Sequence, residues 1–346
     1  MTQDLNLLEK ELMAQNIEVR RNEPIAPYTT MKVGGNALLF VEAADSRMLE
    51  TSIMRAHALG VKYLVIGKGS NIIVSDDGFD GLVIYNNTSS WKILDENTSA
   101  DRKKHVPSRF DPLDPSMNSN SALSYNEDNA PDRIVRADSG LKLYLFMKTL
   151  FEEGITGLQW FAGIPGTVGG AIYMNMHGGN HYFGDLVEKA AVTDGKETKI
   201  VDHDYFQFDY DRSILHETRE VVLWADLRLK AGEVEKAREL AKNWSKEKSN
   251  QPWRSAGCIF RNLSEEDRID LDLPTSSMGY VIDQVLHLKG ERKGDAVISE
   301  SHAAFIENLG DARASDIAAL IGLVREKARE KLGIELKTEV ELIGKF

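Results

Sequence analysis

The sequence predicts an α+β protein built from two or three domains. The chain has 346 residues, and a typical domain has about 100–200. Apolar residues make up 42% of the chain and charged residues 28%, which is the composition of a globular protein with a buried core. Short apolar runs bounded by turn residues alternate with segments of helical periodicity, which indicates a mixture of strands and helices.

The first quarter of the chain contains both kinds of element. An amphipathic pattern predicts helices over 5–14 and 46–59. Short apolar runs between turn residues predict strands over 37–42, 63–66, 72–75 and 82–85.

Residues 87–132 differ in composition from the segments on either side. They are rich in Asn, Ser, Asp and Pro, so they can bury little apolar surface. We predict a mobile insertion here, either a solvated excursion on the surface or a flap over an active site.

Regular structure resumes at Ile134. We predict helices over 141–153, 233–248, 278–286 and 314–332, and strands over 221–229 and 337–343. The charged helix 233–248 is the expected hinge into a further domain. No internal repeat is evident.

Charge and cysteine content exclude several classes of protein. The net charge of −12 opposes binding to a phosphate backbone, so we expect no nucleic-acid partner. Cys258 is the single cysteine, so no intrachain disulfide can form, which fits a reducing compartment. The first residues carry acids and lack the apolar run of a signal peptide, and no run approaches 18 apolar residues. We therefore expect a cytoplasmic protein with no membrane segment.

Three segments combine glycine with apolar residues: "TMKVGGNA" over 30–37, "IGKGSNIIVSDDGFDGLVI" over 66–84, and "AGIPGTVGGAIYMN" over 162–175. Glycine lets the backbone approach a ligand closely, and successive backbone N–H groups can surround phosphate oxygens. Each segment alone could equally be a tight turn. Neither of the last two fits the phosphate-loop pattern or the G-x-G-x-x-G dinucleotide pattern.

In their order along the chain, five motifs resemble one family. "VIGKGSNIIVSDDGFDGLVI" and "GLQWFAGIPGTVGGAIYMN" are followed by "SAGCIFRN" (255–262), "SESHAAFIENLGDARASDI" (299–317) and "GIELKTEVELIG" (333–344). Together they resemble the UDP-N-acetylenolpyruvoylglucosamine reductase family, also called UDP-N-acetylmuramate dehydrogenase. The resemblance covers the chain apart from the insertion.

The resemblance implies a fold and a domain organisation. The expected architecture is the vanillyl-alcohol-oxidase-type two-subdomain FAD-binding fold plus a C-terminal α/β substrate-binding domain. Residues 1–85 would form the first subdomain, joined by the closing strand 337–346. Residues 86–230 would form the second subdomain, and residues 231–336 the domain that binds the UDP-sugar.

The resemblance also implies a reaction. NADPH would reduce a non-covalently bound FAD, and flavin N5 would give a hydride to C3 of the enolpyruvyl group. Protonation at C2 would complete UDP-N-acetylmuramate, a peptidoglycan precursor. The partners implied are NADPH and a small UDP-sugar, with no obligatory protein partner.

Two sets of binding residues follow from the matched motifs. The expected FAD-binding residues are Gly34, Gly35, Gly67, Lys68, Gly69, Ser70, Asn71, Gly163, Ile164, Pro165, Gly166, Thr167, Gly169, Gly170 and Asn175. The expected substrate-binding residues are Arg254, Arg261, Asn262, Lys289 and His302.

The expected catalytic residues are Cys258, Glu339 and Arg212. In the family a serine of the Ser-Ala-Gly-Ser segment donates the proton to C2, and Cys258 stands at that position. A thiol has a pKa of about 8.5, so it is a stronger acid than an alcohol, although it is open to oxidation. Away from its motif, a lone cysteine would be a small buried hydrophobe. Glu339 matches the family's C-terminal catalytic glutamate, which helps to stabilise the enol.

The sequence departs from the family at the third catalytic position. The family pattern is Tyr-Arg-x-Ser, whereas residues 210–213 read "YDRS", with Asp211 at the arginine position and Arg212 after it. A shift of one residue in extended backbone sends a side chain to the opposite face. A local bulge could return Arg212 to the site. Another cation, such as Arg254 or Lys32, could replace it, or the activity could be weakened or altered.

A second departure lies in "MNMHGGNHYFGD" (174–185), where His177 and His181 are unexpected. Histidines four apart on a helix could bind a metal. The glycines between them argue against a helix, so we expect no metal and a redecorated loop near the flavin.

Two other functions stay open. A weakly active flavin- or UDP-sugar-binding homologue would account for Asp211. An FAD-dependent sugar oxidase on the same fold would account for the glycine motifs, but not for Cys258 and Glu339 in theirs.

Overall fold

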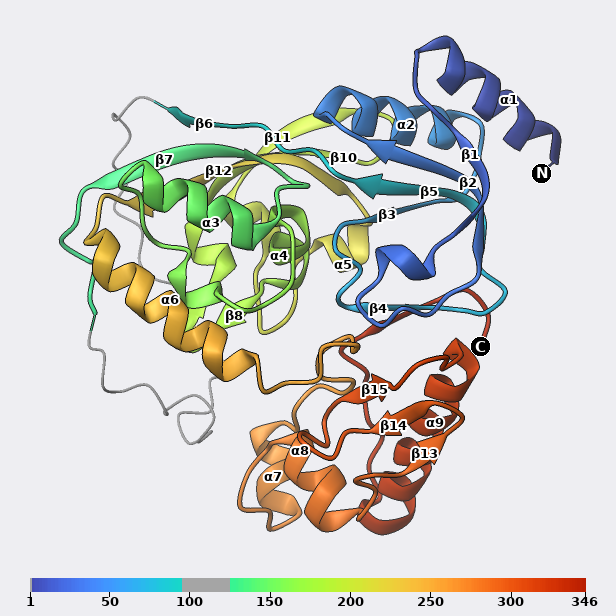
Figure 1. Ribbon diagram of the computed structural model, residues 1–346, viewed down its shortest axis with the longest axis vertical. Coiled ribbons are helices and arrows are strands. Elements are labelled where there is room, and N and C mark those ends of the chain that lie inside the picture. Colours follow the sequence, from blue (N-terminus) through green and yellow to red (C-terminus); the bar gives the residue numbers. More distant parts are fainter. Residues whose placement is uncertain (1, 95–124) are drawn as a thin grey trace.

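The structure, a computed structural model, describes residues 2–94 and 125–346. The central part of the predicted insertion, residues 95–124, lies outside the described residues. Figure 1 shows an upper body that contains both large sheets and a lower lobe formed by the C-terminal third of the chain.

The first sheet has the strand order β1-β2-β5-β3. Its strands are β1 (Arg20–Pro24), β2 (Asn36–Ala43), β3 (Tyr63–Ile66) and β5 (Phe79–Asn86). β5 runs parallel to β2 and β3, and β1 is antiparallel to β2. The helices are α1 (Thr2–Ala14) and α2 (Ser46–Ala58), and the Asp45 side chain caps α2 by accepting a hydrogen bond from the Met48 amide.

The second sheet is antiparallel throughout, with the order β11-β10-β12-β7-β6. Its strands are β6 (Trp91–Leu94), β7 (Asp132–Asp138), β10 (Val187–Thr193), β11 (Thr198–Asp202) and β12 (Val221–Lys230). The other elements of this part are α3 (Leu143–Glu152), α4 (Val168–Met174), α5 (Leu215–Thr218), α6 (Val234–Lys248) and the small hairpin of β8 (His177–Gly178) and β9 (His181–Tyr182).

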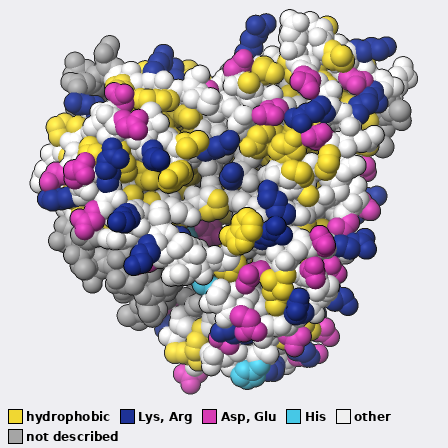
Figure 2. Space-filling model, viewed as in Figure 1, with side chains coloured by type: hydrophobic (Ala, Val, Ile, Leu, Met, Phe, Trp, Pro, Cys, Tyr) yellow, Lys and Arg dark blue, Asp and Glu magenta, His cyan; other side chains and the backbone are white. Residues whose placement is uncertain are grey.

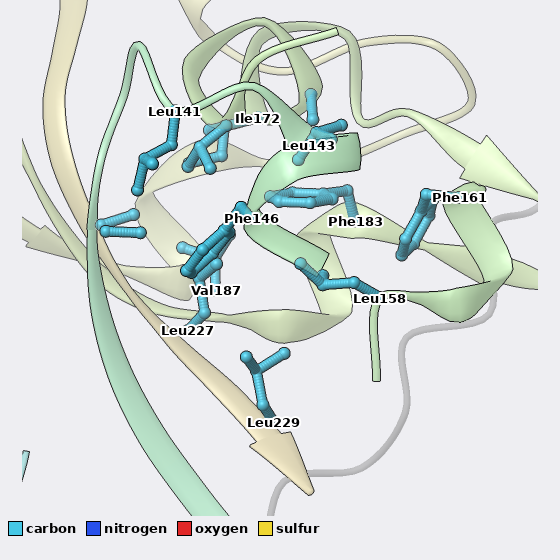
Figure 3. Packing of buried hydrophobic residues seen from close by; sticks show 14 of the residues in the cluster. Leu141, Leu143, Phe146, Leu158, Phe161, Ile172, Phe183, Val187, Leu227 and Leu229 are labelled. Atoms are coloured by element: carbon cyan, nitrogen blue, oxygen red, sulfur yellow. The ribbon is translucent and has the colours of Figure 1, made fainter. Parts of the chain in front are cut away.

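The main core lies between the second sheet and helices α3, α4 and α6. Figure 3 shows Phe146 of α3 near Val187 and Leu227 of the second sheet, the ring of Phe183 beside α3, and Ile172 of α4 near Leu141. Phe146 and Phe183 are almost fully buried. Burial of each such ring contributes about 1.5–3 kcal/mol to folding, so this packing fixes α4 and its preceding loop against the sheet.

The lower lobe has its own core, assembled around the long helix α9 (Ala314–Leu332). The remaining elements are α7 (Glu265–Asp270), α8 (Met278–Tyr280), a π-helical turn (Val281–Val285), β13 (Arg292–Lys293), β14 (Ala296–Ile298) and β15 (Ile306–Asn308). Met31 and Ile73 of the upper body belong to the same apolar cluster. The Asp76 carboxylate accepts hydrogen bonds from the Ala314 and Ser315 amides at 2.8 and 3.0 Å, so it caps α9 from across the boundary.

The C-terminal segment does not form the single strand predicted over 337–343. Its first part pairs with the lower lobe, where the Arg261 amide donates to the Lys337 carbonyl and the Glu339 amide to the Ile259 carbonyl. Its second part, β16 (Glu341–Ile343), pairs in parallel with β4 (Ile72–Val74) of the upper body. The segment therefore crosses between the two parts of the molecule next to Glu339.

Two other structural predictions needed correction. The predicted mobile insertion contains β6, which pairs with β7 because Trp91 can pack on Phe146. The predicted helix 278–286 is a short helix followed by a π-helical turn. The glycine segment 162–175, for which no helix was predicted, contains α4. The α+β class itself is confirmed, and the proposed domain boundaries at 85, 230 and 336 remain predictions.

Candidate active site

A large cavity lies where the first sheet, the second sheet and the lower lobe meet. Its volume is about 1390 Å³, which exceeds the range of roughly 300–1,000 Å³ for a single small ligand. Figure 2 shows the surface hollowed between the upper body and the lower lobe. The cavity therefore has room for an extended cofactor and part of a second molecule.

Two predicted glycine loops line this cavity side by side. One is the loop from β3 to β4, with Gly67, Lys68, Gly69, Ser70 and Asn71. The other is the loop into α4, with Gly163, Ile164, Pro165, Gly166, Thr167, Gly169 and Gly170. The hydroxyl of Ser70 donates to the Pro165 carbonyl at 2.8 Å, so the two loops are tied together directly.

Gly67 shows why the first loop needs glycine. A β-carbon at this position would lie 2.5 Å from Oγ1 of Thr167 and 3.1 Å from its Cγ2. Thr167 cannot readily yield, because it is 3% exposed and its hydroxyl caps α4 by accepting from the Gly170 amide. The two loops approach as closely as they do because residue 67 has no side chain.

Three predicted cofactor residues do not line the cavity. Gly34 and Gly35 pack against Val74 and Asp76, beside β4. Asn175 is buried, its amide nitrogen donates to the Asp209 carbonyl at 2.9 Å, and its amide oxygen accepts from the Gly184 amide at 2.9 Å. Asn175 thus holds two loops together instead of facing the cavity.

Cys258 and Glu339 both line the cavity, although 81 positions separate them in the numbering (339 minus 258). The segment around Cys258 lies between two others: Cys258 pairs with Phe305 on one side, and the Ile259 carbonyl accepts from the Glu339 amide at 2.9 Å on the other. The side-chain amide of Asn71 donates to the Glu339 carbonyl at 3.2 Å. Backbone pairing in the lower lobe and a loop of the upper body therefore fix the two side chains at one place.

The surroundings of the Glu339 carboxyl group favour its neutral form. Burial raises its pKa well above the ordinary value of 4.5, and the nearby Asp211 carboxylate adds to this shift, while Arg261 opposes it. Tyr210 belongs to the same group, since burial raises its pKa and the charges of Asp211, Glu339 and Cys258 contribute. These side chains form one electrostatically connected cluster.

The structure does not bring Arg212 to this cluster. Residues 209–212 form a tight turn in which the backbones of Asp209 and Arg212 exchange hydrogen bonds at 3.0 and 3.2 Å. The turn directs Asp211 into the cavity wall, whereas the Arg212 side chain is 45% exposed and pairs with Glu217. The bulge that could have returned Arg212 to the site is absent from this part of the described chain, so the structure places Arg212 outside the cavity, and its catalytic role stays a prediction.

Neither of the other cations considered from sequence lines the cavity. Lys32 donates from Nζ to the Pro27 carbonyl at 2.7 Å, and burial, with the charges of Lys68 and Arg254, lowers its pKa. Arg254 stacks on Trp253, with its guanidinium carbon 5.0 Å from the ring centre. These side chains form a basic group beside the cavity mouth, where Lys68 and Trp253 contribute to the lining.

The predicted substrate-binding residues are dispersed over the lower lobe. The Nε atoms of Arg254 and Arg261 are buried without a hydrogen-bond partner, so each guanidinium retains a donor for another group. Asn262 accepts from the Met278 amide at 3.0 Å and thereby supports α8. Lys289 lies 3.4 Å from Asp283, and the ring of His302 packs on Phe305. None of these five lines the cavity as the described residues define it.

Sequence analysis did not assign a role to several residues that do line the cavity. The most informative are His177 and Asp211, whose side chains are 3.0 Å apart. Tyr173, Arg219 and Glu341 form a second polar group on the wall, in which the Tyr173 hydroxyl donates to Glu341 and accepts from Arg219. The motif departures at 177 and 211 were the only available sign of the first pair, and no pattern predicted the second.

Metal and membrane functions find no support in the described ranges. No cluster of three or more His, Cys, Asp or Glu side chains in residues 2–94 and 125–346 could hold a metal ion. Over the same ranges, no helix combines the length and apolar character needed to cross a membrane.

Comparison with known proteins gives a consistent result. The family model described as "UDP-N-acetylenolpyruvoylglucosamine reductase, C-terminal domain" matches residues 248–343. The UDP-N-acetylenolpyruvoylglucosamine reductase 1 of Bacillus anthracis is 31% identical over 345 residues, covering 98% of this chain and 99% of its own. The reductase of Caldicellulosiruptor bescii is 32% identical, covering 98% of this chain and 96% of its own.

A solved structure agrees with these sequence matches. The crystal structure of UDP-N-acetylenolpyruvylglucosamine reductase from Thermus caldophilus superposes with a TM-score of 0.67 at 27% sequence identity. The match covers 95% of this chain and 99% of that one. The similarity therefore extends through the upper body and the lower lobe.

Proposed function

Because this chain belongs to the UDP-N-acetylenolpyruvoylglucosamine reductase family, we propose that it reduces UDP-N-acetylenolpyruvoylglucosamine to UDP-N-acetylmuramate with NADPH and FAD. In the balanced reaction the enolpyruvyl double bond gains a hydride at C3 and a proton at C2. NADPH supplies the hydride and becomes NADP⁺, and the proton comes ultimately from water.

One observation carries this proposal. A single cavity contains both glycine loops together with Cys258 and Glu339, although these elements come from distant parts of the chain. The glycine loops suit a phosphate-bearing cofactor, and the thiol and the neutral carboxyl suit proton transfer. The arrangement supports a reductase that works next to a bound cofactor.

The cavity fits FAD. Because Gly67 has no β-carbon, its loop lies directly against Thr167 of the second glycine loop, and backbone N–H groups of such loops can surround a diphosphate. Gly67 to Asn71 and Gly163 to Gly170 are the residues that would hold the cofactor. When bound, FAD transfers two electrons and a hydrogen from NADPH to C3 of the enolpyruvyl group.

Cys258 would donate the proton that C2 needs. The side chain is partly accessible and lines the cavity, so its thiol can reach a substrate. As C3 gains the hydride, negative charge develops at C2 and on the adjacent carboxylate. The S–H bond of Cys258 would break as the new C–H bond at C2 forms, and the thiolate would later regain a proton from water.

Glu339 would act in its neutral form. A carboxylate would repel the developing enolate, whereas a protonated carboxyl can donate a hydrogen bond to it. The raised pKa of Glu339 supports this role. Part of the cavity wall next to Cys258 is formed by Ser255, Ala256 and Gly257. This wall would limit the access of water to the reacting carbon.

The proposal includes a place in the cell. A product used for peptidoglycan would connect the enzyme to cell-wall synthesis, and hence to cell shape and division. A chain with one cysteine suits the reducing cytoplasm.

An anaerobic absorbance experiment tests the proposal. NADPH is added to the FAD-loaded protein and the visible flavin band is followed, and UDP-N-acetylenolpyruvoylglucosamine is then added. We expect bleaching, followed by rapid return of the band and formation of UDP-N-acetylmuramate. A band that bleaches but does not return with this substrate would favour the weakly active homologue or another oxidant, and a protein that binds no flavin would refute the proposal.

A further inference from the structure

We propose that His177, oriented by Asp211, is a catalytic hydrogen-bond donor that stabilises the anionic carboxylate end of the substrate during reduction. The inference rests on the proposed function and deepens it. In the pattern Tyr-Arg-x-Ser, an arginine would stabilise this negative charge. Here we assign that task to the imidazolium of His177 and the carboxylate of Asp211.

The two side chains are paired inside the cavity wall. Nδ1 of His177 lies 3.0 Å from Oδ1 of Asp211, and both residues line the cavity that contains Cys258 and Glu339. The Asp211 side chain is 5% exposed and that of His177 is 24% exposed. Asp211 is thus the buried partner, and His177 is the one that a substrate can reach.

The backbone holds this pair in place. His177 follows α4 after the left-handed residue Asn175, which ends that helix. Asn175 donates to the Asp209 carbonyl at 2.9 Å, and so connects the loop of His177 to the 209–212 turn. Asp211 adopts φ +49° in that turn, a conformation that Asp tolerates better than most residues. The contact therefore depends on two fixed segments and not on a flexible side chain alone.

Asp211 has a further acceptor to satisfy. Its Oδ2 is buried and has no hydrogen-bond partner among the described residues, and a buried acceptor without a donor is costly. Acidic or phenolic groups surround the pair, among them Tyr210, Tyr182 and Asp209. The proposed donor is the imidazolium form of His177, with Nδ1–H directed to Asp211.

The pairing also selects the useful atom of the imidazole. When Nδ1–H donates to a carboxylate, the ring is fixed and its protonated form is stabilised. The remaining donor, Nε2–H, is then free to serve a ligand. Such a donor strengthens its interaction as negative charge grows on the substrate, which is the condition for catalysis.

The other arginines near the cavity are engaged elsewhere. Arg212 pairs with Glu217 outside the cavity. Arg219 lines the cavity but lies 3.6 Å from Glu341, and its side chain is 69% exposed. Arg261 acts on Glu339 and does not reach the cavity lining. The His177–Asp211 pair lines the same cavity as both proposed catalytic groups, and its imidazole is held by a buried carboxyl group.

The first test compares the two half-reactions in His177→Gln, which removes the charge and retains a side chain of similar reach. We expect flavin reduction by NADPH to be unchanged and reoxidation by the enolpyruvyl sugar to slow by about 10²–10³-fold, the usual effect of removing one such donor. His181→Gln is the matched control, since His181 lies in the same hairpin and stacks on Trp160 with ring centres 3.8 Å apart, outside the cavity lining. It should leave both half-reactions unchanged.

A rescue experiment separates chemistry from structural damage. Adding Asp211→Arg to His177→Gln places a permanent cation at the position the family pattern reserves for arginine. We expect the double variant to recover most of the lost reoxidation rate. Asp211→Asn alone should slow reoxidation as His177→Gln does, and ¹⁵N-histidine NMR of that variant should show loss of the fixed Nδ1–H form of His177.

A binding measurement gives a readout that does not depend on turnover. Titration calorimetry with oxidised protein measures the affinity for UDP-N-acetylmuramate. We expect His177→Gln to lower this affinity by about tenfold or more, because a hydrogen bond to a charged group is lost. UDP-N-acetylglucosamine, which lacks the lactyl carboxylate, should bind equally to both proteins.

The outcomes are distinguishable. Wild-type protein whose flavin is not reoxidised by the substrate would refute the proposed function, and this inference with it. Two outcomes would overturn the role of His177 and leave the proposed function intact. In the first, wild type and His177→Gln are reoxidised equally fast. In the second, His177→Gln loses the same affinity for both UDP-sugars. Slow reoxidation that the added arginine does not restore would show that His177 supports the loop and not the substrate's charge.

Discussion

The substitution Gly67→Ala tests the cofactor loop most directly, because the structure fixes what the added methyl group meets. Gly67 has an ordinary backbone conformation, outside the positive-φ region, so alanine introduces no backbone strain. The effect must come from contact with Thr167, whose Oγ1 would lie 2.5 Å away. Ordinary contact begins near 3.4 Å, so one of the two loops has to move by about 1 Å.

The expected cost follows from that contact. Overpacking by one methyl group in a well-packed region costs about 1–3 kcal/mol, and loss of the Thr167 cap on α4 would add about 1 kcal/mol. We expect urea denaturation to show a decrease of about 2 kcal/mol in the free energy of unfolding. If the displaced loop also binds FAD, the affinity of the apoprotein for FAD should fall by at least about tenfold, equivalent to 1.4 kcal/mol.

A double variant isolates the cause. Thr167→Ala removes Oγ1 and Cγ2 and retains Cβ, which would lie 3.4 Å from the added methyl group. Gly67→Ala should therefore cost little in that background, which gives a coupling free energy of about 1–3 kcal/mol. Gly322→Ala in α9 is the control, since no atom lies within 4 Å of its added methyl group. Unchanged FAD affinity in Gly67→Ala would refute the assignment of this loop to the cofactor.

Three further predictions concern the catalytic groups and the core. Cys258→Ala should leave flavin reduction intact and slow reoxidation by about 10²–10⁴-fold, the usual share of a general acid, whereas Cys258→Ser should retain activity; equal reoxidation rates in wild type and the alanine variant would remove the thiol from the mechanism. Because burial raises the pKa of Glu339 above its ordinary value of 4.5, the folded protein keeps a proton that the unfolded chain loses, so wild-type stability should decline as pH rises from 4.5 through the folded pKa. Glu339→Gln should lack this decline, and identical stability–pH curves would contradict the neutral carboxyl. Asp226 is fully buried and accepts two hydrogen bonds from Arg136 at 2.7 and 3.0 Å. Asp226→Ala should therefore lower the free energy of unfolding by about 3–5 kcal/mol, whereas the exposed control Glu330→Ala should lower it by less than about 0.5 kcal/mol. Similar urea midpoints for the two variants would refute this prediction.

Sequence patterns located the longer helices and three strands of the first sheet because their causes are local, whereas strands such as β10 and β11 of the second sheet were not predicted. The strand Tyr63–Ile66 has the predicted bounds, and α2 and α9 end within one residue of theirs. Apolar periodicity and end residues such as Asp45 and Gly333 act within one turn of a helix. The edge strand Trp91–Leu94 escaped prediction because it is stabilised by pairing with a distant strand and by packing on Phe146, inside a segment of strongly polar composition.

The site shows the same division between local and long-range causes. Sequence alone identified the glycine loops, Cys258 and Glu339, because each is part of a recognisable motif. It also showed that Asp211 replaces the expected arginine. It could not show which way Arg212 points, since that depends on the tight turn that residues 209–212 adopt.

The sequence by itself thus determined the α+β class, the family and the chemical groups available for reduction and proton transfer. The tertiary structure decided which of those groups share a cavity. Backbone pairing of Ile259 with Glu339 brought Glu339 beside the segment of Cys258, and the Asn175 contact with Asp209 placed His177 against Asp211. Motifs record residue types that recur at fixed spacing. These contacts instead join residues between 34 and 80 positions apart, from 209 minus 175 to 339 minus 259. Such contacts form only when the whole chain packs, because their free energy depends on burial that no single segment can provide.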